Sequence, residues 1–175
     1  MSSEFNQLLT TQIGIIGEAI VKRHLEKKYV IYAPENDEAH PFDKFCVERE
    51  PQEGSNREVF IAEIKTKICR DKYPDTGFNV SSYKDYKFMQ DEHKIRVKIF
   101  FVDHREQKVY GHWLDFLDEE RWIETSYGSI KYPSEGFGKG GKPVIYFPRE
   151  VMDNYFDLEE EDCKKILEKS EVLKK

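Results

Sequence analysis

The stretch Phe60-Ile61-Ala62-Glu63-Ile64-Lys65-Thr66-Lys67 is the most informative part of this 175-residue chain. Its apolar residues predict a strand, and side chains along a strand alternate between the two faces of a sheet. Glu63 and Lys65 therefore share one face near the end of the strand. A carboxylate and an amine that emerge together from an apolar strand are candidates for a functional site.

A second acid begins the preceding apolar run, where His40-Pro41-Phe42-Asp43 leads into a predicted strand over 42–47. The polar linker 51–56 predicts that this strand and the strand over 59–65 form an antiparallel hairpin. Two acids and a lysine on neighbouring strands can hold a divalent metal and a water against a phosphate. This combination indicates phosphodiester chemistry, and among the histidines only His40 is expected near the site.

A helix over 5–28 is predicted before these strands. Gly14, Gly17 and Glu18 share one of its faces, and two glycines are costly in a helix interior unless something packs closely there. We expect this helix to lie tightly on the sheet with Glu18 directed at the site, so that Asp43, Glu63 and Lys65 converge in one cleft that Glu18 faces.

The rest of the pattern predicts an α/β protein in the order helix, three strands, helix, strand, followed by additions. The expected elements are a strand over 29–33, a loop over 69–78, a helix over 81–93 capped by Ser81, a hairpin of strands 97–102 and 108–113, a short helix over 113–120, a loop-rich region over 125–142, a strand over 144–147 and a helix over 158–169.

Composition limits the class of protein. With 38% hydrophobic and 14% aromatic residues, the chain is too apolar to be disordered, and its length favours a single domain over 1–175. Cys46, Cys69 and Cys163 form no Cys-x-x-Cys pair, which argues against a disulfide framework and a structural zinc site. The apolar run 13–21 is short and contains an acid, so we expect no signal peptide, no membrane span and a cytoplasmic location.

The net charge of −6 weighs against a general nucleic-acid binder, but it is unevenly distributed. Residues 57–108 hold 12 Lys or Arg against 9 Asp or Glu, a balance of +3, whereas the flanks carry −4 and −5. The basic segment contains Glu63 and Lys65. A local patch of this kind can bind phosphates even in an acidic protein.

Short motifs need context in so charged a chain. The acid-x-Lys spacing also occurs at Glu26–Lys28, Asp85–Lys87, Glu92–Lys94, Glu106–Lys108 and Asp162–Lys164. Only the Glu63–Lys65 pair closes an apolar strand beside a second acid; the alternative is a surface ion pair. The run 136–142 fits a phosphate-binding loop by count, but Pro143 replaces the required Ser or Thr, so we interpret it as a flexible loop.

These features together resemble the PD-(D/E)xK nuclease superfamily, especially its branch similar to archaeal Holliday junction resolvases. The resemblance covers about residues 10–105, and Phe42, between Pro41 and Asp43, departs from the strict motif. It implies a restriction-endonuclease-like core over about 10–112, with a mixed central sheet flanked by helices (αβββαβ), and a C-terminal elaboration over 113–175. The matching segments are Gly14-Ile15-Ile16-Gly17-Glu18, Pro41-Phe42-Asp43, Glu63-Ile64-Lys65, helix 81–93 and strand 97–102.

The resemblance also implies site roles in a nuclease that depends on Mg²⁺ or Mn²⁺. Asp43, Glu63 and the Ile64 backbone carbonyl would bind the metal. Lys65 would orient or help deprotonate the attacking water and offset charge at phosphorus. Glu18 would bind a second metal, a metal-bound water or Lys65.

Nucleic acid is the expected partner, with DNA favoured over RNA, although the same residues would serve either. The predicted contacts are Lys67, Tyr83, Lys84 and Lys87. An equal alternative to nucleic-acid contact is that the helix over 81–93 is a partly buried amphipathic helix whose lysines extend to solvent. Lys67 is equally well explained as a solvated lysine at the edge of the sheet. A catalytically inactive binding or regulatory module is the alternative function, and the sequence is compatible with a monomer or a homodimer.

Overall fold

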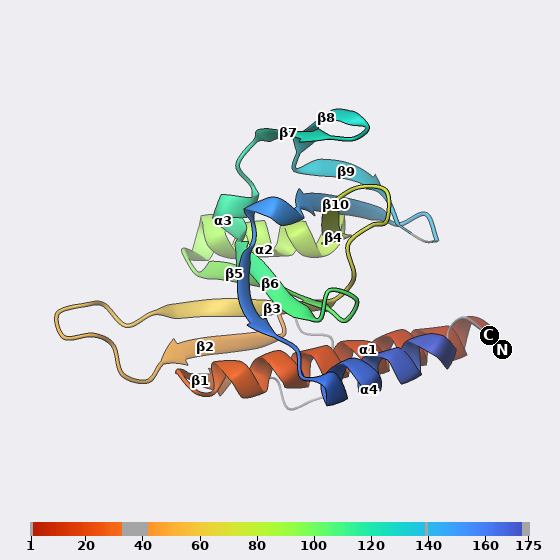
Figure 1. Ribbon diagram of the computed structural model, residues 1–175. Coiled ribbons are helices and arrows are strands. Elements are labelled where there is room, and N and C mark those ends of the chain that lie inside the picture. The colour runs from red at the N-terminus through yellow and green to blue at the C-terminus, as the bar shows by residue number, and fades with distance from the viewer. Residues whose placement is uncertain (1, 33–41, 139, 173–175) are drawn as a thin grey trace.

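A mixed sheet with the strand order β1-β2-β3-β5-β6-β11 forms the centre of the protein within the residues that the computed structural model describes, which are 2–32, 42–138 and 140–172 (Figure 1). Its strands are Tyr29–Tyr32 (β1), Lys44–Glu48 (β2), Val59–Thr66 (β3), Arg96–Asp103 (β5), Lys108–Trp113 (β6) and Asp153–Asp157 (β11). Strands β3 and β5 are parallel, and the other neighbours are antiparallel. A parallel pair needs a crossover connection, which contains helix α2 (Val80–His93).

A smaller antiparallel sheet with the order β4-β10-β9 lies beside α2 and shares a core with it against the main sheet, and a separate hairpin of β7 and β8 lies beyond the smaller sheet (Figure 1). The bounds of these strands are Asp75–Asn79 (β4), Arg121–Thr125 (β7), Gly128–Tyr132 (β8), Ser134–Phe137 (β9) and Pro143–Pro148 (β10). The short helix α3 (Leu114–Leu117) follows β6, and a 3-10 turn over Arg149–Val151 connects β10 to β11.

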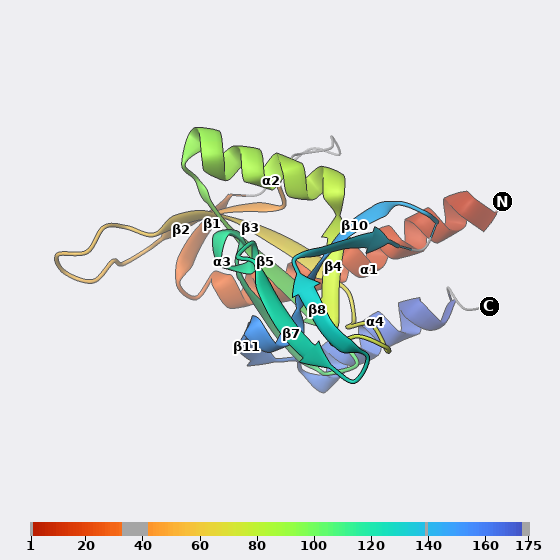
Figure 2. The ribbon, with the colours of Figure 1, turned by 90° about the horizontal axis from the view of Figure 1, so that it is seen from above.

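Strand β3 is covered on both faces, which explains its nearly continuous apolar sequence. On one face, Phe60, Ala62 and Ile64 belong to a core built with helices α1 (Ser2–Leu25) and α4 (Glu160–Val172). On the other face, Ile61 belongs to a core shared with α2 and the smaller sheet. Figure 2 shows the turn of the β2–β3 hairpin projecting beyond these layers. No described helix is both long enough and apolar enough to cross a membrane.

Most predicted elements are present, including the first helix, the β2–β3 hairpin, the helix over 81–93 and the β5–β6 hairpin. Two predicted loops are wrong: 69–78 contains most of β4, and 125–142 contains β8 and β9. Strand β11 was not predicted. These strands have few apolar residues, and local propensity does not hold them in place. Pairing does: β4 and β9 pair with β10, β8 pairs with β7, and β11 pairs with β6. Helix α2 starts at Val80, after the N-cap residue Asn79, so Ser81 is not the cap.

Of the two glycines in α1, only Gly17 is needed for close packing. A Cβ atom at Gly17 would come within 1.9 Å of Thr66 Oγ1 and 3.1 Å of Thr66 Cβ, because α1 crosses the end of β3 there. At Gly14 a Cβ atom would meet nothing within 4 Å, so the expectation that both glycines pack tightly is wrong for Gly14.

This difference predicts opposite effects on stability. Gly14→Ala should raise the free energy of unfolding by up to about 1 kcal/mol, because alanine favours a helix more than glycine. Gly17→Ala should lower it by about 1–2 kcal/mol, because the new methyl group clashes with Thr66. Urea denaturation measures both. Adding Thr66→Ala to Gly17→Ala should recover part of the loss, and equal effects of the two alanine substitutions would contradict the described packing.

Candidate metal and active site

Asp43 and Glu63 lie side by side at the end of the β2–β3 hairpin. Lys44 is opposite Ala62 in the register, so continuing the pairing by one residue places Asp43 opposite Glu63, on the same face of the sheet. The Ile64 backbone N–H donates a hydrogen bond of 2.7 Å to Asp43 Oδ2. This bond fixes the Asp43 carboxylate against β3, next to the acid predicted to be its partner.

Glu63 is the buried member of the acid pair. Its side chain is 1% exposed, whereas that of Lys65, which forms an ion pair with Glu63 Oε1, is 26% exposed. The second oxygen, Oε2, is buried without a hydrogen-bond partner among the described residues. Tyr86 approaches this carboxylate from α2 without a well-formed hydrogen bond to Oε2, and burial followed by the charge of Glu63 raises the pKa of its hydroxyl.

The charges in this cluster are strongly coupled. Burial, followed by the neighbouring Glu63 carboxylate, raises the pKa of Asp43 to about 6. Burial alone would lower the pKa of Lys65, but the Glu63 and Asp43 carboxylates outweigh it, so the pKa is raised. At neutral pH the cluster therefore holds a protonated Lys65 amine beside two crowded acidic side chains.

A cavity of about 580 Å³ opens beside this cluster. Asp43 and Lys65 line it from the sheet, and Glu18 lines it from α1. Glu18 accepts a hydrogen bond of 2.7 Å from Lys44 Nζ instead of contacting Lys65. The structure therefore brings Asp43, Glu63 and Lys65 together, and Glu18 lines the same cavity as Asp43 and Lys65. The expectation that all of them share one cleft is not met for Glu63, which is buried and is not among the described lining residues.

The donor set is small but suits a hard cation. Within the described residues, no group of three or more His, Cys, Asp or Glu side chains is arranged to hold a metal ion. Asp43 and Glu63 offer two carboxylates, and the Ile64 carbonyl is the third predicted ligand. Mg²⁺ typically uses one or two carboxylates and completes its shell with water and phosphate oxygens. The unpartnered Glu63 Oε2 and the raised pKa of Asp43 both fit a place for a cation.

The predicted nucleic-acid contacts are divided between two places. Lys67 lines the cavity and donates a hydrogen bond of 2.9 Å to the Gly77 carbonyl. Tyr83 and Lys87 both bind Asp118, at the end of α3, and Lys84 is exposed. Within the described residues, α2 thus presents Tyr86 to the site, while Tyr83 and Lys87 are engaged elsewhere.

Sequence reasoning missed the role of two residues. Lys44 neutralises Glu18, and Tyr86 covers Glu63. The register of the hairpin could have indicated Lys44, since it follows Asp43 and faces α1. His40 and Pro41 lie outside the described residues.

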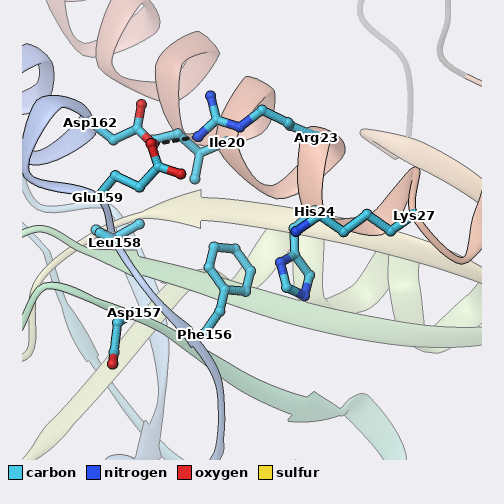
Figure 3. Close-up of a pocket in the computed structure, with 9 residues that line it drawn as sticks. All are labelled: Ile20, Arg23, His24, Lys27, Phe156, Asp157, Leu158, Glu159 and Asp162. Atoms are coloured by element: carbon cyan, nitrogen blue, oxygen red, sulfur yellow. Dashed lines mark hydrogen bonds and ion pairs between the residues drawn. The ribbon is translucent and has the colours of Figure 1, made fainter.

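A separate cavity of about 420 Å³ lies between the end of α1 and the start of α4 (Figure 3). Arg23 and Asp162 form an ion pair at its edge, and His24 stacks on Phe156 with ring centroids 3.9 Å apart. None of the predicted catalytic residues lines this cavity. The positive and negative charges of its lining largely balance, so this cavity does not offer a metal site comparable to the Asp43–Glu63 pair.

No protein-family model matches the chain, and no curated protein matches it. Function must therefore be inferred from the side chains of the site.

The acid pair predicts a pH-dependent effect on stability. Because the pKa of Asp43 is raised from 3.8 to about 6, its contribution to stability is complete below about pH 4 and is lost as pH rises through 6. In chelator, Asp43→Asn should raise the free energy of unfolding at pH 7.5 by about 1–2 kcal/mol, discounted for partial exposure, and should have little effect at pH 4. Asparagine retains an acceptor for the Ile64 N–H. Urea denaturation at both pH values tests this, and a loss of stability at pH 7.5 would contradict the coupling.

Proposed function

We propose that the protein is a metal-dependent nuclease that hydrolyses phosphodiester bonds, with DNA as its preferred substrate. The observation that carries the proposal is the pairing of Asp43 with Glu63 beside the Lys65 amine, at the wall of a cavity. Two adjacent, partly unsatisfied carboxylates are unfavourable unless a cation neutralises them. A nearby lysine suits a reaction in which negative charge develops on a phosphate.

The arrangement of elements supports a restriction-endonuclease-like core. Helix α1, strands β1 to β3, helix α2 and strand β5 follow the expected αβββαβ order, and β5 is parallel to β3. Strand β4 interrupts this order between β3 and α2, but it pairs in the smaller sheet. The resemblance to PD-(D/E)xK nucleases implies a site formed by Asp43, Glu63 and Lys65 at the end of the β2–β3 hairpin.

A bound Mg²⁺ or Mn²⁺ would polarise the phosphate and lower the pKa of a coordinated water. Asp43, Glu63 and the Ile64 carbonyl would hold it. Lys65 has a raised pKa, so it stays protonated at neutral pH. We therefore assign it to charge stabilisation and to orienting the attacking water, in preference to proton removal.

Glu18 supplies a carboxylate from the opposite wall of the cavity. Lys44 compensates its charge through an ion pair. In the proposed reaction it holds a water by hydrogen bonding across the cavity, and Lys44 fixes its orientation. This role would make Glu18 less critical than Asp43 and Glu63.

A binding module without catalysis is the second candidate. The observation that favours it is the near-complete burial of Glu63 in its ion pair with Lys65, an arrangement that also occurs in purely structural pairs. The two functions differ in what a divalent cation does to the protein and to its substrate.

The nuclease proposal predicts a specific pattern of mutant activity. Asp43→Asn, Glu63→Gln and Lys65→Ala should each reduce Mn²⁺-dependent cleavage by at least about 100-fold, because each removes a metal ligand or a transition-state charge. Lys65→Ala should still bind nucleic acid when metal is present. The assay would offer plasmid, single strands, branched junctions and RNA with Mn²⁺ or chelator.

Glu92→Gln provides the matched control, because Glu92 belongs to another acid-x-Lys triplet, on the exposed surface of α2. It should cleave like the unmodified protein. Full activity in any of the three site variants would refute the assigned roles.

Metal binding predicts a change in stability that needs no activity. At a concentration tenfold above its dissociation constant, Mg²⁺ or Ca²⁺ should raise the free energy of unfolding by about 1.4 kcal/mol. Glu63→Gln and Asp43→Asn should abolish this gain, whereas Glu92→Gln should keep it. Denaturation with metal or chelator measures the effect, and equal stabilisation of all four proteins would place the cation elsewhere.

A further inference from the structure

A second cavity, of about 440 Å³, adjoins the candidate site. It lies against β4 and β10 of the smaller sheet, and its lining includes Lys67 and Ile68, which also line the cavity beside Asp43. Ile68 and Arg70 in turn belong to a third open hollow, over residues 68–73. The three hollows therefore form one continuous surface that leads away from Lys65 along the smaller sheet.

The second cavity is basic in a protein whose net charge is −6, and the third hollow adds Lys72 together with one carboxylate, Asp71, which forms an ion pair with Arg105. The described lining of the second cavity contains Lys67, Arg70 and Lys142 and no carboxylate. Arg70 is held by Asp75 through two hydrogen bonds of 2.5 Å, so its charge is compensated. Lys142 is exposed and, within the described part of the chain, forms no ion pair. Its charge is available to an anionic ligand.

Cations and aromatic rings alternate along the outer part of this surface. The Arg70 guanidinium lies between two rings, 3.8 Å from the centroid of Tyr146 and 4.7 Å from that of Tyr73. Lys72 Nζ then lies 5.6 Å from Tyr73 and 4.9 Å from Tyr127. Tyr127, at the turn of the β7–β8 hairpin, is 58% exposed. We name these five residues the cation–aromatic row.

We propose that this surface binds a single-stranded stretch of nucleic acid next to the scissile bond. Lys67, Lys72 and Lys142 would contact its phosphates, and the exposed ring of Tyr127 would stack on an unpaired base. The inference rests on the proposed nuclease function for the position of the scissile bond, but the binding surface itself can be tested without cleavage.

The chemistry of the surface favours a single strand over a duplex. Grooves that bind single strands combine cations along the backbone with aromatic side chains on which bases stack. A paired base cannot present its face to Tyr127, because its neighbours in the duplex cover it. A lipid headgroup would use the lysines but not the alternating rings, and a protein ligand would need acidic residues to match them.

The experiment measures the affinity of labelled oligonucleotides by fluorescence anisotropy with Ca²⁺, which avoids cleavage. A single strand is compared with a duplex of the same length, over a range of salt concentrations. The variants are Lys72→Gln with Lys142→Gln, and Tyr127→Ser. These side chains are exposed and bind no buried partner, so the fold should be kept. Lys27→Gln is the matched control, because Lys27 lies beyond the other end of α1 and lines the separate cavity of Figure 3.

The double lysine variant should bind the single strand at least about tenfold more weakly, and its salt slope should fall by about 1.4, since each lost phosphate contact removes about 0.7. Tyr127→Ser should weaken binding about fivefold or more. Lys27→Gln should change neither quantity. Unchanged affinity in the lysine and tyrosine variants, an equal loss for the duplex, or no binding of single strands at all would overturn the inference.

The outcome separates the two proposals. If the unmodified protein cleaves nothing but still binds single strands through Lys72 and Lys142, the nuclease proposal fails and the surface stands. If cleavage depends on Asp43 and Glu63 while the lysine variants bind and cleave normally, the nuclease proposal stands and the surface is refuted.

Discussion

Burial of the Glu63 carboxylate at the end of β3 is the constraint on which the rest of the structure depends. A carboxylate that is 1% exposed is costly to hold in its charged form, and a single ion pair with Lys65 offsets only part of that cost. Replacing such a pair with packed apolar groups often leaves a protein equally or more stable. Stability alone therefore does not explain the pair, and the second acid, Asp43, makes the cluster less stable still. A cluster of this kind is typical of a site that binds a cation or carries out chemistry.

The surrounding elements hold this unfavourable cluster in place. The hairpin register sets Asp43 opposite Glu63, and the Ile64 N–H prevents Asp43 from turning to solvent. Gly17 lets α1 cross the end of β3 closely enough for Glu18 to reach the same cavity. Tyr86 closes the other side of Glu63. The large apolar contact area of β3, packed on both faces, supplies the stability that the acids remove.

The site was more predictable from the sequence than the outer part of the fold. Strand β3 and its hairpin have a strong apolar pattern and a clear turn. The alternation of side chains along a strand therefore predicted on which face of the sheet Glu63, Lys65 and Asp43 lie. Strands β4, β8, β9 and β11 could not be predicted, because polar residues and glycines dominate them and their pairing partners are distant in sequence. The same limit hid Tyr86 and Lys44, whose contacts with Glu63 and Glu18 depend on how a helix packs on a sheet. The bonds of Tyr83 and Lys87 to Asp118 depend on α3, which follows them by about thirty residues.

The unpredicted strands also change how the charge of the protein is understood. Along the sequence, only a mildly basic central segment distinguished the chain from an ordinary acidic protein. In the fold, β10 and the β7–β8 hairpin bring Lys142 and Tyr127 from an acidic part of the sequence to the surface that holds Arg70 and Lys72. Charge near a ligand decides binding more than net charge does, because salt screens contributions beyond about 10 Å. An acidic chain can therefore present a basic, aromatic surface beside a pair of acids. In the proposed function a divalent cation would have two effects: it would neutralise the acids, and it would remove the repulsion that otherwise keeps a phosphate away from them.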